Sequence, residues 1–304
     1  MALTPVADRL TAIDDESLTR LGFRADDRRD VLLTIERALA EPAVLGRIQQ
    51  VADQLAQRVG RFDERGDPFA LPDGFDDLDP DVLDKEWGVG VLPLLALVAT
   101  AADVAAFHAG RGIEPTTSAE SLSDLGQQAW VHRRTFGGFG LHTFGWLRIC
   151  WSGALYWLGR LQFNLTRYGG DWVVSTHIPE SGPLTPEACA ESFGRARAFF
   201  GRHFPDYPTR VFHCDSWLLD PQLTEVLAPE SNMVRFQQLW QLDGQRRNGD
   251  GDALFFVFRR RGEVDYSTLP QDTSLQRAIV RKLASGGHWY ACEGSIDQDR
   301  FPPR

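Results

Sequence analysis

Cysteine is scarce in this sequence. The 304 residues include four cysteines, at positions 150, 189, 214 and 292, and no two of them form a C-x-x-C pair. No H-x-x-x-H pattern accompanies them, so the spacing argues against the common zinc motifs and against a disulfide framework. We therefore expect no metal site and four reduced, mostly buried thiols.

Long hydrophobic runs and an N-terminal leader are also lacking. The longest uncharged stretch, residues 87–102, contains Pro93 and is shorter than the ~20 apolar residues that span a bilayer. The first residues show no basic segment leading into an apolar one, which is the pattern of a secretory signal. These absences predict a cytoplasmic protein without a membrane partner, in which residues 87–102 form a buried helix.

Positive charge is in deficit. The chain has 32 Lys and Arg against 42 Asp and Glu, a net charge of −10 at pH 7. Surfaces that bind nucleic acid or anionic membranes are normally basic, so neither partner is expected. The proportions of hydrophobic residues (43%) and charged residues (24%) are those of a globular protein, and the length fits about two domains.

The first half of the sequence has helical periodicity. Hydrophobic residues recur at three- and four-residue spacing over 31–39 and 44–59, as a helix needs to bury one stripe. Pro42 separates the two predicted helices, and Gly60 ends the second. Three further elements are expected: a helix over 92–106, a capped helix that begins near Ser121 or Ser123, and a solvated acidic loop over 67–84.

The pattern changes at residues 136–144, where glycines and aromatic residues mix without a helical period. We interpret this segment as a turn or crossover between a helical domain, 1–145, and a second domain, 146–304. Runs rich in Val, Phe, Trp and Thr predict strands in the second domain, over 160–165, 172–178, 210–214, 233–242 and 253–259. The last two are expected to pair as an antiparallel hairpin.

Helices alternate with these strands. The clearest spans 186–204, with Thr185 as N-cap and Pro186 at its first position. A short helix near Pro221 and a closing helix over 275–283 follow. The predicted fold class is therefore α+β, a helical N-terminal domain followed by a mixed-sheet domain.

Four runs of residues carry a resemblance to a known family. They are LGRLQF (158–163), HIPESGPLTPEACAESFGRARAFFGRHFP (177–205), CDSWLLDPQL (214–223) and SNMVRFQ (231–237). The chain resembles a bacterial acyltransferase family that joins a helical N-acyltransferase N-terminal domain to a C-terminal domain like the GCN5-related N-acyltransferases (GNAT). The resemblance covers most of the chain and is most specific over 158–237.

The resemblance implies an N-acyltransferase that uses acyl-CoA, acetyl-CoA or a longer thioester, as co-substrate. The acyl group would pass directly to an amine acceptor, a small molecule or a peptide. The strands 172–178 and 210–214 would part to admit the pantetheine arm. Residues near this slot are the expected donor-binding residues: Ile178, whose backbone would polarise the carbonyl, Ser181, Gly182, Leu184, Thr185 and Asn232.

Four side chains are candidates for catalysis by position. His177, Glu180 or Asp215 could take the proton of the amine, and Ser216 could protonate the departing thiolate. Each also has a structural interpretation: His177 as a hydrogen-bonded strand residue, Glu180 as a solvated loop residue, and Asp215 and Ser216 as caps of the next turn. A nucleophilic Cys214 with a nearby histidine is a more distant alternative. Asn232 could instead end a helix in the left-handed conformation.

One departure favours a rival function. The GNAT pattern Q/R-x-x-G-x-G/A is replaced here by ESGPLT, with a single glycine, and a helix N-terminus alone is a weak anion site. The literal match Arg246, Gly249 and Gly251 is rejected, because it would join two hairpin strands and carries two aspartates. The rival is a non-catalytic acyl-CoA-binding or protein-interaction module on a GNAT scaffold. The acceptor and the oligomeric state stay open.

Overall fold

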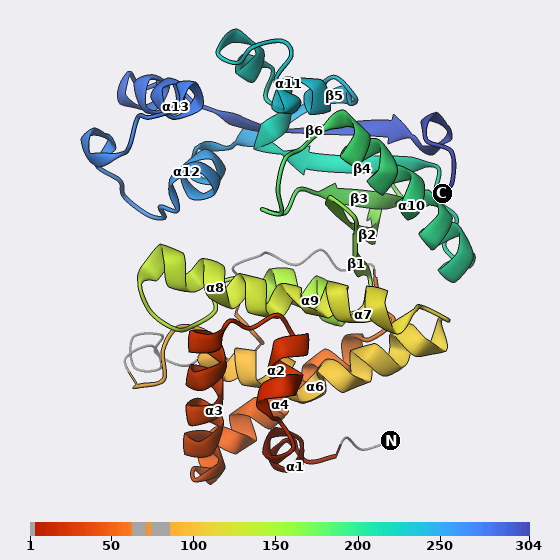
Figure 1. The fold of residues 1–304 in the computed structure, drawn as a ribbon, viewed down its shortest axis with the longest axis vertical. Coiled ribbons are helices and arrows are strands. Elements are labelled where there is room, and N and C mark those ends of the chain that lie inside the picture. Colours follow the sequence, from red (N-terminus) through yellow and green to blue (C-terminus); the bar gives the residue numbers. More distant parts are fainter. Residues whose placement is uncertain (1–3, 63–70, 74–85) are drawn as a thin grey trace. The chain divides into compact units, whose positions relative to one another are not determined.

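The computed structural model describes residues 4–62, 71–73 and 86–304. The chain divides into two compact units, Met1–Trp157 and Leu158–Arg304, which Figure 1 shows in sequence colours. This division falls downstream of residue 145, because the helix that follows the predicted turn packs against other helices of the first unit. Most of the predicted acidic loop over 67–84 lies outside the described residues.

The first unit is a bundle of helices. They are α1 (Val6–Thr11), α2 (Asp15–Arg20), α3 (Ala25–Leu39), α4 (Pro42–Arg58), α6 (Val91–Gly110), α7 (Pro115–Leu122), α8 (Asp124–Phe136) and α9 (Phe144–Trp151). The predicted helices over 31–39, 44–59 and 92–106 are thus confirmed as α3, α4 and α6. Pro42 stands at the start of α4, and Ser123 precedes α8.

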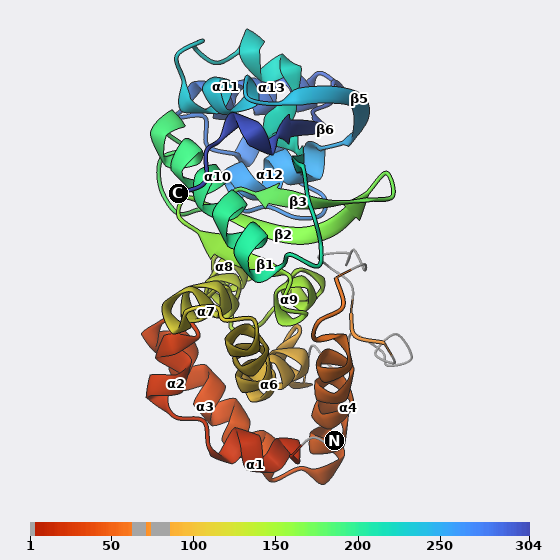
Figure 2. The same cartoon turned by 90° about the vertical axis from the view of Figure 1, so that its right-hand side faces the viewer.

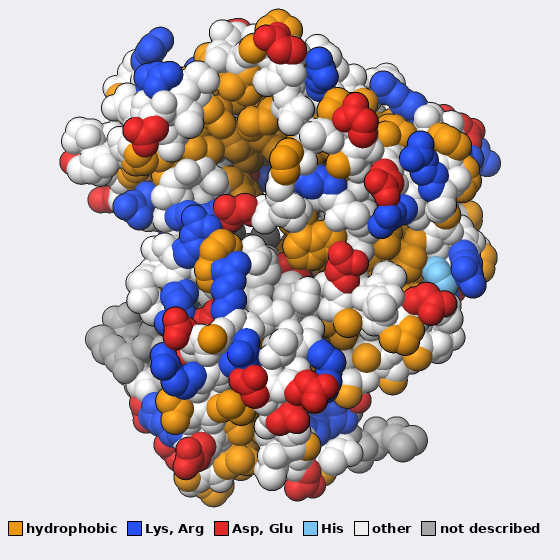
Figure 3. Space-filling view, in the orientation of Figure 1, with side chains coloured by type: hydrophobic (Ala, Val, Ile, Leu, Met, Phe, Trp, Pro, Cys, Tyr) orange, Lys and Arg blue, Asp and Glu red, His pale blue; other side chains and the backbone are white. Residues whose placement is uncertain are grey.

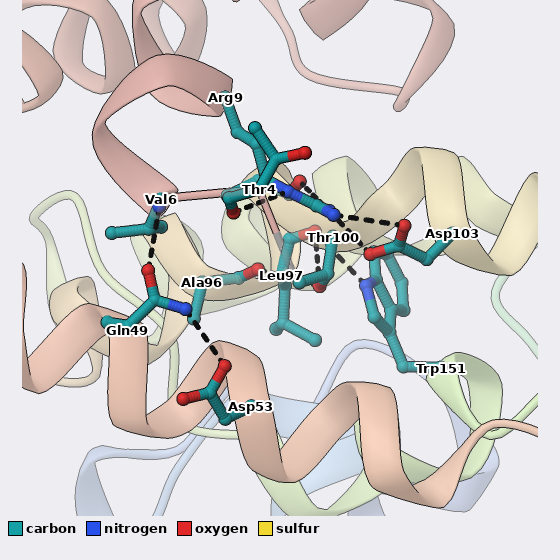
Figure 4. A network of polar contacts seen from close by, with 11 residues as sticks. Thr4, Val6, Arg9, Gln49, Asp53, Ala96, Leu97, Thr100, Asp103 and Trp151 are labelled. Atoms are coloured by element: carbon teal, nitrogen blue, oxygen red, sulfur yellow. Dashed lines mark hydrogen bonds and ion pairs between the residues drawn. The ribbon is translucent and has the colours of Figure 1, made fainter. Parts of the chain in front are cut away.

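Helix α6 is the core of this unit. It contacts α1, α4, α7 and α9, which surround it in Figure 2. Among the described helices it alone is long and apolar enough to cross a membrane, but most of it is buried inside the unit. Polar contacts fix it there, since Trp151 donates to the carbonyl of Leu97 at 3.0 Å and Arg9 pairs with Asp103 at 2.5 Å (Figure 4).

The second unit is built on a mixed sheet with the strand order β1-β2-β3-β4-β6-β5, and the edge strand β1 begins in the last residues of the first unit. The strands are β1 (Leu155–Leu158), β2 (Leu161–Tyr168), β3 (Asp171–His177), β4 (Val211–Ser216), β5 (Gln241–Asn248) and β6 (Tyr290–Asp297). Only β3 and β4 pair in parallel; the other pairs with a described register are antiparallel. The predicted strands over 160–165, 172–178 and 210–214 are confirmed as β2, β3 and β4.

Helix α10 (Pro186–His203) is the parallel crossover from β3 to β4. Thr185 caps it as predicted, because its hydroxyl accepts the backbone N–H of Ala188 at 3.3 Å. Phe193 of α10 is fully buried and contacts Phe163 of β2 and Phe212 of β4. This aromatic core holds α10 against one face of the sheet, which we call the α10 face.

The predicted hairpin of 233–242 with 253–259 is wrong. Residues of the first run form α11 (Asn232–Gln237) before β5 begins, and the second run forms α12 (Asp250–Phe258). Aspartates in the first turn of α12 favour a helix N-terminus, and burial of four of its apolar side chains overrides their preference for strands. The strand β5 consists instead of the polar residues that were expected to form the loop, and its partner is β6.

The remaining elements are short or close the chain. They are the 3-10 helices η1 (Trp217–Leu219), η2 (Pro221–Glu225), η3 (Tyr266–Thr268) and η4 (Gln298–Arg300), and α13 (Ser274–Ala284). The predicted helices near Pro221 and over 275–283 are confirmed as η2 and α13. The strands β1 and β6 were not predicted. The observed fold class is that expected, with helices first and a mixed sheet second.

Candidate functional site

The strands β3 and β4 pair over a short length and then continue without pairing. Their parallel register contains Val174 with Phe212 and Ser175 with His213. Beyond it β3 continues to His177 and β4 to Ser216, while β3 remains paired with β2 as far as His177. The two strands named from the resemblance therefore part at their carboxyl ends.

The face of the sheet opposite α10 is polar at this point. Side chains alternate along a strand. The residues that precede and follow Phe163 on β2 and Phe212 on β4 therefore point away from the α10 face. In antiparallel pairs, directly opposite residues share a face, and Gln162 is opposite His177 while Asp215 is opposite Glu293. We call this polar surface the site face; it comprises Gln162, Asn164, His177, His213, Asp215 and Glu293.

His177 is held by a neighbour on β2. Its Nε2 lies 2.6 Å from Oδ1 of Asn164, and the Asn164 amide nitrogen donates to the carbonyl of Leu165 at 2.9 Å. Because Oδ1 must accept, Nε2 carries the proton and the lone pair of the ring is at Nδ1. Burial, together with nearby His213, lowers the pKa of His177 to about 3, so the ring is neutral at physiological pH.

A second histidine shares the site face. His213, which is 2% exposed, lies with its Nε2 3.2 Å from a carboxylate oxygen of Glu293. The ring of Tyr168 stacks on His213 with centroids 4.1 Å apart, and its hydroxyl donates to Asp243. These contacts connect the His213 ring on β4 to Tyr168 on β2 and to Glu293 on β6.

Asp215 and Ser216 have different surroundings. Asp215 lies on the site face, with Nε of Arg247 3.4 Å from its carboxylate. Burial raises the pKa of Asp215, while Arg247 opposes that shift. Ser216 caps η1, accepting the backbone N–H of Leu218 at 3.2 Å, which is the structural role weighed for it from sequence.

Glu180 is turned away from the histidines. It is exposed and pairs with Arg259, the residue that ends α12 in the left-handed conformation with φ 56°. The structure therefore brings together His177 and Asp215 with His213 on the site face, but it does not bring Glu180 or Ser216 into the same group. An ion pair between the β3–α10 loop and α12 is the observed contact of Glu180.

The β3–α10 loop is organised by Arg160. Its guanidinium donates to the carbonyls of Pro179 at 2.9 Å, Gly182 at 3.0 Å and Pro183 at 3.2 Å, and its Nη1 lies 3.3 Å from the hydroxyl of Ser181. Burial lowers the pKa of Arg160. A cation thus contacts the loop that contains the expected donor-binding residues Ser181 and Gly182, which leads into the capped start of α10.

The other expected donor-binding residues surround this loop or lie on a later element. Ile178 directly follows β3, Leu184 is buried and Thr185 caps α10. Asn232 is the first residue of α11, so its alternative role as the left-handed end of a helix is wrong.

The thiol alternative does not fit the structure. Cys214 is fully buried on β4, next to His213 in sequence but on the opposite face, and burial raises its pKa well above the ordinary value. A buried neutral thiol is not a nucleophile. The described residues contain no group of three His, Cys, Asp or Glu side chains that could hold a metal.

The rejected glycine match needs a correction. Gly249 lies between the strand β5 and the helix α12, and Gly251 lies in the first turn of α12, so the expected hairpin context was wrong. The adjoining carboxylates are nevertheless engaged: Asp250 accepts from the backbone of Trp289 at 2.8 Å, and Asp252 pairs with Arg247 at 2.9 Å. A phosphate would meet negative charge there, and the rejection stands on that ground.

Sequence reasoning missed Asn164, Glu293 and Arg160 as members of the site. Arg160 lies within the run LGRLQF, in the turn before β2, and Asn164 directly follows the run. The alternation of polar and apolar residues along β2 was the available signal for Asn164. No such signal marked Glu293, because the strand that carries it, β6, was not predicted. His213 is a further member of the site that was not among the candidate residues.

Comparison with known proteins identifies both units. Residues 14–153 match the family model described as an N-acyltransferase N-terminal domain, and residues 155–296 match that of a GNAT-like C-terminal domain. No curated protein sequence matches the chain.

Solved structures of acyltransferases are similar over nearly the whole chain. An acyltransferase in complex with decanoyl-CoA is 34% identical, with a TM-score of 0.81 and coverage of 93% of this chain and 86% of that one. A complex with decanoyl-CoA and teicoplanin is 33% identical, with a TM-score of 0.80 and coverage of 93% and 87%. A mutant acyltransferase bound to octanoyl-CoA is 32% identical, with a TM-score of 0.81 and coverage of 93% and 86%.

Proposed function

The chain belongs to the family of acyltransferases that join an N-acyltransferase N-terminal domain to a GNAT-like C-terminal domain, and we propose that it transfers a medium-length acyl group to an amine of a peptide-derived acceptor. It is an acyl-CoA-dependent N-acyltransferase. The length and the acceptor class follow the relatives, which bind octanoyl-CoA or decanoyl-CoA and, in one case, teicoplanin as well. A donor made from coenzyme A supports a cytoplasmic location.

The parting of β3 and β4 carries this proposal. The gap that opens after Ser175 and His213 gives the pantetheine arm a passage between the two strands. The pyrophosphate would lie against Ser181, Gly182 and Thr185, where the Arg160 cation and the start of α10 supply positive charge. Arg160 thereby offers an electrostatic substitute for the glycines that the ESGPLT segment lacks.

The chemistry assigned to His177 is proton removal. The amine nitrogen attacks the thioester carbonyl carbon, and the C–S bond then breaks to give an amide and the CoA thiolate. The nitrogen of the tetrahedral adduct is cationic and therefore acidic, so a weakly basic neutral imidazole suffices to accept its proton at Nδ1. We assign the backbone N–H of Ile178 to polarisation of the carbonyl, and the thiolate takes a proton from solvent.

The carboxylates of the site face suit an amine acceptor. Asp215 and Glu293 lie on opposite partners of the β4/β6 pair, next to the two histidines. Negative charge at this position attracts an ammonium group. The ammonium loses one proton to solvent before the neutral amine attacks, and the nitrogen of the adduct then gives a second proton to His177. We assign these two residues to acceptor binding, because both are carboxylates beside the histidines and Arg247 already holds Asp215 in an ion pair.

A medium-length chain also needs apolar surface near the thioester. The second unit contains an apolar cluster around α12 and α13 whose buried members include Trp217, Leu254 and Phe258, with partly buried Leu218 and Val257 packed against it. Figure 3 shows a hollow lined by hydrophobic side chains in this region of the unit. Trp217 directly follows the last residue of β4, so the cluster begins where the parted strands end.

Thermal-shift titration tests the donor, and product analysis tests the transfer. Acetyl-CoA, octanoyl-CoA and decanoyl-CoA are compared, because a ligand at 100 times its Kd stabilises the native state by about 2.7 kcal/mol. We expect the longer thioesters to bind more tightly than acetyl-CoA and to release CoA thiol with formation of an N-acylated teicoplanin core. Equal binding of all three thioesters would contradict the proposed chain length, and absence of thiol release with any amine would contradict the transfer.

A further inference from the structure

Gln162 of β2 buries a hydrogen-bond donor that is unused. The side chain is 3% exposed, and its Nε2 has no hydrogen-bond partner among the described residues. A buried unpaired amide costs free energy, so native proteins seldom keep one without a purpose. We propose that the carboxamide of Gln162 binds the carbonyl oxygen of the thioester and stabilises the oxyanion that forms during transfer.

The register places Gln162 beside the reacting groups. It is directly opposite His177 in the antiparallel β2/β3 pair, where opposite side chains lie on one face with Cβ atoms roughly 5 Å apart. Asn164, two residues further along β2, holds the other side of the His177 ring. Two side-chain amides of β2 therefore lie on the same face as His177. Asn164 is hydrogen-bonded to the ring, and Gln162 has a donor available.

The chemistry needs a donor at this position. As the amine attacks, the carbonyl oxygen gains negative charge, and donors fixed in a buried site stabilise it strongly. One N–H group comes from the backbone at Ile178 in the proposed function, on which this inference rests. The Gln162 N–H supplies a second, and both hydrogen bonds weaken again when the C–S bond breaks and the amide carbonyl re-forms.

Thr176 gives an internal comparison. Its hydroxyl is 1% exposed and likewise has no partner within the described part of the chain. Thr176 is next to His177 on β3 but on the α10 face, opposite Phe163. It therefore cannot serve the same carbonyl from the site face.

The test is Gln162→Met, which keeps the length of the side chain and removes the donor. We expect kcat with octanoyl-CoA to fall about 100-fold, the usual loss for one oxyanion donor, while KM for octanoyl-CoA rises by a much smaller factor, because the ground-state carbonyl loses one hydrogen bond. The melting temperature of the unliganded protein is expected to stay or rise, because an unsatisfied buried donor is removed. The matched control is Gln237→Met: Gln237 is buried but bonded to the carbonyl of Asp220 at 2.6 Å, so its loss should lower the melting temperature and leave kcat unchanged.

A binding measurement separates this inference from the proposed function. Wild-type protein is expected to bind octanoyl-CoA more tightly than S-octyl-CoA, which lacks the carbonyl. Gln162→Met should reduce that preference by weakening octanoyl-CoA binding, and should leave S-octyl-CoA binding unchanged. If Gln162→Met melts earlier and keeps the wild-type kcat, the residue is structural and the inference is wrong. If the wild type transfers acyl groups and the variant does so equally well, the inference fails and the function stands. If the wild type binds neither analogue, both fail.

Discussion

On the α10 face, Phe163, Phe193 and Phe212 pack against one another with ring centroids 4.8–5.7 Å apart. One residue away along the same strands, the site face presents side chains that are just as buried but polar, among them Gln162 and His213. One face of the sheet contributes hydrophobic stability, and the other keeps polar groups in a low-dielectric environment where they act on a substrate. Alternation along a strand is enough to separate these tasks.

Truncation of the aromatic core should have the largest effect. Phe193→Ala removes a fully buried ring that contacts four other aromatic residues, and such changes cost about 4 kcal/mol. Urea unfolding measures the loss. Phe256→Ala, at a residue that is 51% exposed, should change the free energy of unfolding by less than about 0.5 kcal/mol; equal losses for both variants would break the distinction between core and surface rings.

A change on the site face should instead affect turnover. His177→Gln removes the proposed base while keeping a polar side chain for Asn164, so we expect kcat to fall about 100-fold with the Kd for decanoyl-CoA unchanged. Steady-state kinetics and calorimetric titration provide the two values. Cys214→Ala serves as the control, because its thiol is buried on the other face; loss of kcat there would revive the nucleophilic alternative.

The neutral state of His177 should also be visible in the pH dependence of the free energy of unfolding. The pKa of His177 is about 3 in the folded protein against 6.5 for the free side chain, so between these values the unfolded chain binds a proton that the native state does not. Stability is therefore fully present above pH 6.5 and declines as the pH falls toward 3. His177→Gln should lose about 2 kcal/mol less than wild type between pH 7 and pH 5 in urea titrations. If the free energies of unfolding of wild type and His177→Gln change equally with pH, the His177 ring is not held in a buried, neutral state.

The smallest expected effect concerns the donor loop. Arg160→Met removes the guanidinium that binds the carbonyls of Pro179, Gly182 and Pro183, and the Kd for CoA should rise about tenfold, the equivalent of 1.4 kcal/mol. Arg195→Met, which breaks only an exposed pair with Glu191 on α10, should leave that Kd unchanged. Equal effects of the two variants would indicate that overall charge, rather than loop geometry, governs binding.

The sequence allowed correct prediction of the elements with a strong local signal. The stripe of apolar residues in α4, the cap at Thr185 and the β-branched run in β3 each act within one element, and each prediction is confirmed. His177 could also be placed at the end of its strand.

The failures involve contacts between distant segments. α12 looked like a strand because Phe and Val favour strands, and its helical state depends on burial in the cluster around α13. β5 is polar and nearly all exposed, so it becomes a strand through pairing with β6 and shows no pattern of its own. The dyad of His213 and Glu293 joins residues eighty positions apart, a distance at which local patterns carry no information.

The edge strand β5 has a consequence for the behaviour of the protein at high concentration. An exposed edge can recruit strands from other molecules and start aggregation. Here that edge carries Asp243, Arg246 and Arg247, and its register shifts between Leu242 and Arg246. Charge and irregularity both oppose addition of a foreign strand, so the sheet resists sideways growth even though its last strand is uncovered.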